Sequence, residues 1–74
     1  MNENTPLPDR LARLAAGRAN LQRGCETARA CGDSEWAYQN RDALDEYDRE
    51  ITALLALATP AEIREAREIT NAPI

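Results

Sequence analysis

The stretch from Cys25 to Trp36, "CETARACGDSEW", decides the fold because it carries the signal for a reversal of the chain. Gly32 can adopt the left-handed conformation that ends many helices, and Asp33 or Ser34 can cap the helix that follows. One long helical pattern precedes this turn and another follows it. We therefore expect an antiparallel helical hairpin with this stretch at its tip.

Helical signals continue outward from the turn to both ends of the chain. Pro6 and Pro8 disfavour helix near the N-terminus, whereas Thr59, Pro60 and Glu62 carry a capping-box signature. The sequence predicts one domain, 1–74, with an irregular lead-in (1–8), a first helix (9–31), a second helix (34–58) and a short third helix (60–71). Because Ala and Leu are abundant and Phe and Val are absent, the composition favours an all-α fold over a sheet.

The two long helices carry rows of mainly apolar residues that can be aligned with each other. In an antiparallel pair, facing positions have residue numbers with a constant sum, and these rows meet that condition. The pairs are 28 with 37, 25 with 40, 21 with 44, 18 with 47, 14 with 51, 11 with 54 and 7 with 58. Charge agrees, because residues 9–31 carry five Arg against two acids and residues 33–58 carry seven acids against two Arg.

A hairpin of this length has only a narrow seam and would bury little apolar surface alone. The first helix also presents Ala12, Ala16 and Ala19 on a second face, where small side chains permit close approach by another helix. We therefore expect a homodimer in which two hairpins form a four-helix bundle, with these alanines at the oligomer contact. The short third helix is either a flap over the open end of the hairpin or a contact arm in the dimer.

Arg18 interrupts the apolar row of the first helix and faces Tyr47, with Asp48 beside it. A charge in a seam needs a partner, or it must reach water from the seam edge. Either Asp48 or an acid of the second subunit is expected to meet it. We interpret Arg18, Tyr47 and Asp48 as a device that fixes helix register or the choice of dimer partner.

Composition excludes several classes of function. The formal net charge is −4, and without a basic stripe the chain is not expected to bind nucleic acid directly. No apolar run could cross a membrane and the N-terminus does not resemble a signal peptide, so we expect a cytoplasmic protein. The chain lacks His and Lys and has no nucleophile with a base beside it, so we expect no enzyme.

The cysteines and the acidic run do not form a recognisable metal site. Cys25 and Cys31 are six residues apart on one helix, too far apart to form a disulfide, and no histidine accompanies them. The acidic run over residues 42–50, "DALDEYDRE", lacks the glycine and the oxygen spacing of a calcium loop. We therefore predict no metal and no cofactor, and we interpret the two cysteines as parts of a structural corner.

The acidic run is instead interpreted as a surface. On a helix its carboxylates fall opposite the apolar seam, so they form either a solvated face or a surface for a basic partner. Tyr38 also points away from the seam, beside Arg41 and acids, so it is either an anchor for a partner protein or a dimer contact within the bundle. The predicted partner-binding residues are Tyr38, Arg41, Asp42, Asp45 and Arg49.

A short acidic helical hairpin without catalytic motifs resembles the small accessory proteins with which temperate phages inhibit host factors, including quorum-sensing antiactivators and CRISPR inhibitors. This resemblance implies a protein-binding modulator or inhibitor of a host regulator, defence factor or nucleic-acid-binding protein. Two alternatives stay open. In the first, the chain is an assembly subunit whose dimerisation is its function. In the second, it is a sponge, a protein that sequesters a small anionic nucleotide, with Arg18, Arg13 and Tyr47 at a subunit seam.

Overall fold

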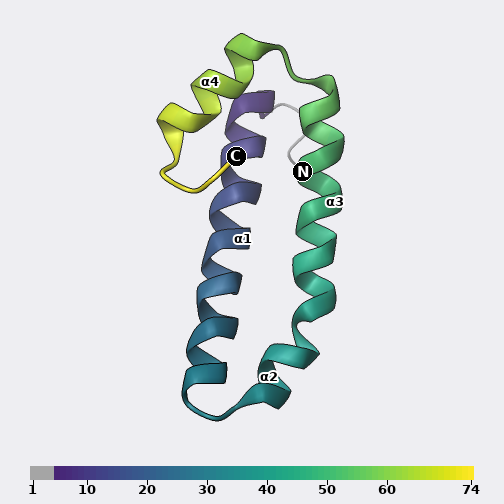
Figure 1. Cartoon of the computed structure of the whole chain (residues 1–74). Coiled ribbons are helices and arrows are strands. Elements are labelled where there is room, and N and C mark those ends of the chain that lie inside the picture. The colour runs from purple at the N-terminus through teal and green to yellow at the C-terminus, as the bar shows by residue number, and fades with distance from the viewer. Residues whose placement is uncertain (1–4) are drawn as a thin grey trace.

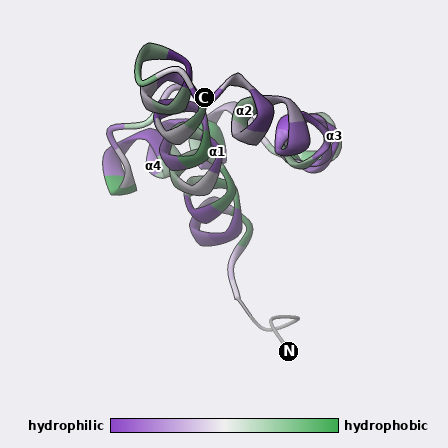
Figure 2. Cartoon of the chain, turned by 90° about the horizontal axis from the view of Figure 1, so that it is seen from below, coloured by the Kyte–Doolittle hydropathy of each residue, from purple (hydrophilic) through white to green (hydrophobic). Residues whose placement is uncertain are grey.

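The computed structural model describes residues 5–74, and this part of the chain is helical without a β-strand. The helices are α1 (Leu7–Ala30), α2 (Ser34–Gln39), α3 (Arg41–Leu57) and α4 (Pro60–Ile69). Helix α1 is central, with α3 along one side and α4 along the other, as Figures 1 and 2 show from two directions. The resulting rod measures 41 × 21 × 21 Å.

Helix α1 begins two residues earlier than predicted, at Leu7. Pro8 lies in its first turn, where the missing N–H has no intrahelical acceptor to lose and the fixed φ suits a helix. The predicted lead-in is therefore shorter than eight residues, and residues 1–4 of it lie outside the described part of the chain.

The turn at the hairpin tip has the predicted chemistry. Gly32 has a φ of +86°, which L side chains adopt only with strain. The Asp33 carboxylate then caps α2 by accepting a hydrogen bond of 3.2 Å from the Trp36 backbone N–H. Gly32 and Asp33 therefore reverse the chain between α1 and α2.

The predicted second helix is divided in two at Asn40, which ends α2 and starts α3. The Asn40 side-chain Nδ2 donates to the Trp36 carbonyl oxygen at 2.8 Å, and the Asn40 backbone N–H shares that oxygen. An asparagine side chain that bonds to a nearby carbonyl competes with the helical ladder. Near the tip, the alignment of α1 with the following helix therefore differs from the predicted one. Cys25 Sγ lies 4.0 Å from the Ala37 carbonyl oxygen, whereas the sequence predicted that Cys25 faces Asn40.

Helix α4 begins where the capping box predicts. Thr59 accepts from the Glu62 backbone N–H at 3.2 Å, and the Glu62 carboxylate accepts from the Thr59 N–H at 2.9 Å. The helix ends at Ile69, two residues before the predicted end, because Thr70 is extended with a ψ of 147°. The approach to Pro73 favours extended backbone in the preceding residue, so the helix cannot continue through the C-terminus.

The main core lies at the open end of the hairpin, where α4 covers α1. Its fully buried members are Leu11, Ala12 and Ala66. The half-buried apolar residues around them are Leu7, Ile51, Leu54, Leu55, Ile63 and Ile74. Helix α3 has no fully buried residue, so the seam between α1 and α3 is thin along its whole length.

The alanine face of α1 is covered by α4 and the C-terminal segment of the same chain. Ala12 lies beneath α4 with only 2% of its surface exposed, and Ala16 and Ala19 line grooves beside Thr70. Small side chains allow this close approach, as the sequence indicated. The helix that uses the face in this structure belongs to the chain itself, which agrees with the interpretation of α4 as a flap.

Two glycines of α1 receive aromatic rings from across the seam. A Cβ built on Gly17 would lie 2.7 Å from the Tyr47 hydroxyl oxygen. One built on Gly24 would lie 3.2 Å from Cη2 of Trp36. The missing side chains at these positions therefore make room for rings on the α1–α3 and α1–α2 contacts.

Candidate protein-binding surface

Tyr38 is the most exposed aromatic residue in the described part of the chain. It lies on the short helix α2 with 65% of its surface exposed. The guanidinium carbon of Arg41, at the start of α3, lies 4.6 Å from the centre of its ring. This distance is typical of a cation–π contact, which favours this orientation of an otherwise exposed ring.

The other predicted partner-binding residues lie on α3, on the side turned away from α1. Arg41, Asp45 and Arg49 follow one another at four-residue spacing, so they share one stripe of the helix, with Asp42 next to it. All four are exposed. We call Tyr38 and these four residues the outer face. They come from α2 and α3, which lie on the opposite side of α1 from α4 (Figure 1).

The charges of the outer face are mostly available to a partner. Arg49 pairs with Glu46 at 3.0 Å, one turn earlier on the same helix. Neither Asp42 nor Asp45 forms an ion pair within residues 5–74. An exposed ring beside unpaired carboxylates can give a partner both an apolar anchor and charges that select it.

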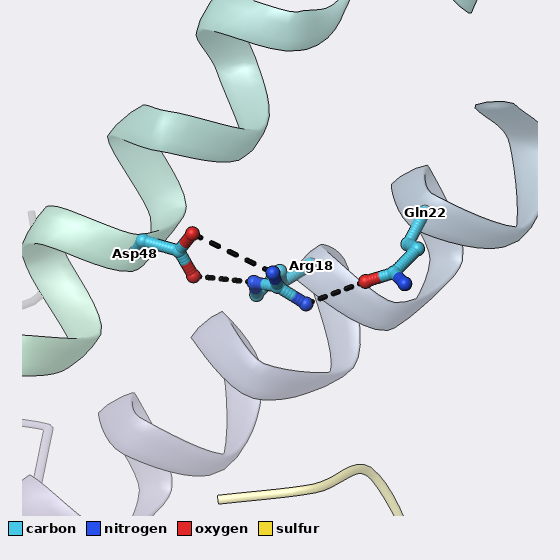
Figure 3. Close-up of polar contacts among 3 residues, drawn as sticks. All are labelled: Arg18, Gln22 and Asp48. Carbon is cyan, nitrogen blue, oxygen red and sulfur yellow. Dashed lines mark hydrogen bonds and ion pairs between the residues drawn. The ribbon is translucent and has the colours of Figure 1, made fainter.

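The arginine in the α1 row meets the acid that the sequence indicated. Arg18 Nε donates to Asp48 Oδ1 at 2.5 Å, and Arg18 Nη1 donates to Gln22 Oε1 at 2.6 Å (Figure 3). The side chains of Arg18 and Asp48 are 35% and 52% exposed, so water screens the pair. It joins α1 to α3 within one chain.

The residues of the nucleotide-sponge alternative do not share one site in this structure. The Arg18 guanidinium is held by Asp48 and Gln22. Tyr47 packs against Gly17, and Arg13 lines a different hollow farther toward the open end of the hairpin. Within a single chain these three side chains do not surround one ligand site, whereas the sponge alternative places them at a seam between two subunits.

The remaining sequence candidates for chemistry are separate from one another. Cys25 is buried beside α2, whereas Cys31 is exposed at the tip, and both thiols are free. Within residues 5–74, no three His, Cys, Asp or Glu residues are grouped as metal ligands would be. No helix in that range is long and apolar enough to span a bilayer.

A hollow between α1 and α3 was not recognised from the sequence. It is an open hollow of about 420 Å³, with Arg10, Arg13 and Leu14 on one wall and Glu50 and Leu54 on the other. A signal was available, since Arg10 and Arg13 lie at three-residue spacing next to the seam row. These charged residues were expected to lie in solvent away from the seam, whereas Arg10, Arg13 and Glu50 border it.

Comparison of the chain with protein-family models, curated proteins and solved structures found no match.

Proposed function

We propose that this chain is a small non-enzymatic modulator that binds another protein through the outer face and inhibits it by occupying its surface. The observation that carries the proposal is the exposed Tyr38 ring in cation–π contact with Arg41. Aromatic residues and arginines are enriched among the residues that dominate binding energy in protein interfaces. A ring that is already positioned loses little conformational entropy on binding.

The partner that fits this surface carries basic side chains around an apolar pocket. Helix α3 presents five acids against two arginines over residues 41–50. Complementary charge would speed encounter with such a partner and would disfavour acidic proteins. A host regulator or defence factor whose basic surface normally holds nucleic acid has this chemistry, and occupation of that surface would inhibit it.

We further propose that the modulator is a homodimer in which two hairpins form a four-helix bundle. The small core supports this, because only six hydrophobic residues of the described chain are fully buried and none of them lies on α3. A second hairpin would bury more of the thin α1–α3 seam. Dimerisation would also present two copies of the outer face.

The test is capture of partners from the source cell on immobilised wild-type protein and on two variants. The first variant combines Tyr38→Ala with Asp42→Arg, and both residues are exposed, so the fold should be unaffected. The matched control is Glu65→Arg, a charge reversal on the exposed side of α4. One stoichiometric partner that is lost on the first variant and kept on the control is expected. Retention of that partner on both variants would contradict the assignment of the outer face.

A further inference from the structure

The hollow between α1 and α3 is part of a longer open groove. Toward the tip the groove continues along Leu14, Ala43 and Tyr47, which border the same seam. Helix α4 does not line either hollow, because it packs on α1 at the alanine face. One side of the hairpin seam is thus covered by its own chain and the other side is open.

The open side carries unsatisfied charge on both walls. Arg10 and Arg13 belong to α1 and Glu50 belongs to α3, and none of them forms an ion pair within residues 5–74. Arg10 Nε is buried without a hydrogen-bond partner in the same range. Arg13 and Glu50 are exposed, so their unpaired charges are available to a second molecule that carries the complementary pattern.

Apolar surface is also exposed on the groove side of α3. Leu57 is 74% exposed and lies seven residues after Glu50, which places both side chains on the same stripe of the helix.

We propose that the occupant of the groove is a second copy of this chain, related by a two-fold axis that runs along the hairpin. This inference rests on the proposed dimer and is independent of the outer face. Such an axis places α1 of one copy against α3 of its partner at the same height. Arg13 of each copy then meets Glu50 of the other, and the Leu57 side chains are covered at the open end.

The pattern of charge favours this occupant over an unrelated helix. The α1 wall of the groove carries Arg10 and Arg13, and the α3 wall carries Glu50. When α1 of one copy faces α3 of its partner, each basic wall therefore meets an acidic wall. A two-fold axis across the hairpin would instead place α1 against α1 and bring like charges together. The register is fixed because Arg18 pairs with Asp48, which holds Arg13 and Glu50 at similar heights on the two walls.

The test is analytical ultracentrifugation of wild type, Arg13→Glu and Glu50→Arg, each alone and with the two variants mixed. Each variant alone places like charges at both symmetric contacts, so its dimer should dissociate about tenfold more readily or worse. The equimolar mixture restores attraction at both contacts and should give a heterodimer as tight as the wild-type dimer. Arg64→Glu and Glu68→Arg, exposed charges of α4, serve as matched controls and should leave the dimer unchanged.

Leu57→Asp gives a second measurement that does not depend on charge pairing. Its side chain is already exposed in the single chain, so circular dichroism should show unchanged helix content while the dimer weakens. A wild-type chain that stays monomeric at hundreds of micromolar would overturn the inference. So would a mixture of the two charge variants that fails to recover the dimer. Capture of a partner by the outer face is measured separately, so failure here is distinguishable from failure of the proposed function.

Discussion

Because Gly17 contacts Tyr47, we expect Gly17→Ala to lower the stability of the chain, although helix propensity alone predicts that it should raise it. Replacing a glycine inside a helix with alanine normally stabilises it by about 1 kcal/mol. At Gly17, however, the new Cβ would lie 2.7 Å from Tyr47 Oη and 3.0 Å from two ring carbons. The Tyr47 ring must therefore shift away from α1, and overpacking of this kind costs about 1–3 kcal/mol. We expect Gly17→Ala to destabilise the chain by about 1 kcal/mol net.

Gly24 provides a matched control on the same helix. Its Cβ would lie 3.2 Å from the outermost carbon of Trp36, whose side chain is 39% exposed and can shift by a few tenths of an ångström. Gly24→Ala should therefore stabilise the chain by about 0.5–1 kcal/mol. In a Tyr47→Ala background the obstacle is gone, so Gly17→Ala should also become stabilising, by about 1 kcal/mol.

The assay is urea unfolding followed by circular dichroism at one protein concentration, because stability of an associating chain depends on concentration. The expected result is opposite signs for Gly17→Ala and Gly24→Ala, with the first reversed by Tyr47→Ala. Equal stabilisation by both substitutions in the wild-type background would refute the packing of Tyr47 on Gly17.

Three further predictions concern the ion pair, the thiols and the capping box. Arg18→Leu should change the free energy of unfolding by less than about 1 kcal/mol, because its pair with Asp48 is screened; a loss of several kcal/mol in urea unfolding would show that the pair is more than a register contact. In the native protein a thiol reagent should modify Cys31, which is exposed, and should modify Cys25 only after denaturation. Reaction of both thiols at equal rates in the native protein would contradict the burial of Cys25. Thr59→Ala should cost about 1 kcal/mol and raise amide hydrogen exchange mainly in α4, whereas uniform exchange changes would show that the cap serves the whole chain.

The sequence predicted the hairpin because its signals were local and consistent. Gly32 and Asp33 mark the reversal by backbone chemistry, and Thr59 with Glu62 marks the start of α4. The facing rows predicted that Arg18 lies near Asp48, and the two side chains do form an ion pair across α1 and α3. These features depend on few residues, so they could be read without the tertiary structure.

The bend at Asn40 could not be predicted from the same rules. An asparagine inside a helical pattern is only slightly unfavourable, so its presence permits a bond from its side chain to the Trp36 carbonyl without requiring one. The packing of α4 on the alanine face was likewise open, because small residues accept a helix from the same chain or from another one.

The outer face could be predicted in part. Helical spacing was enough to place Arg41, Asp45 and Arg49 away from the seam. The sequence also placed Tyr38 near Arg41, but their cation–π contact spans two helices and was not predicted. The unpaired charges of the groove were missed, because their position depends on how closely α1 and α3 approach.

The central claim is that Tyr38 anchors a partner protein on the outer face, and calorimetric titration of the captured partner into wild type and Tyr38→Ala tests it most directly. Interface anchors of this type contribute 2 kcal/mol or more, so the dissociation constant should rise about thirtyfold or more. Glu65→Arg should leave it unchanged. A dissociation constant for Tyr38→Ala within about twofold of wild type would contradict the account, because hot-spot anchors cost far more than that when truncated.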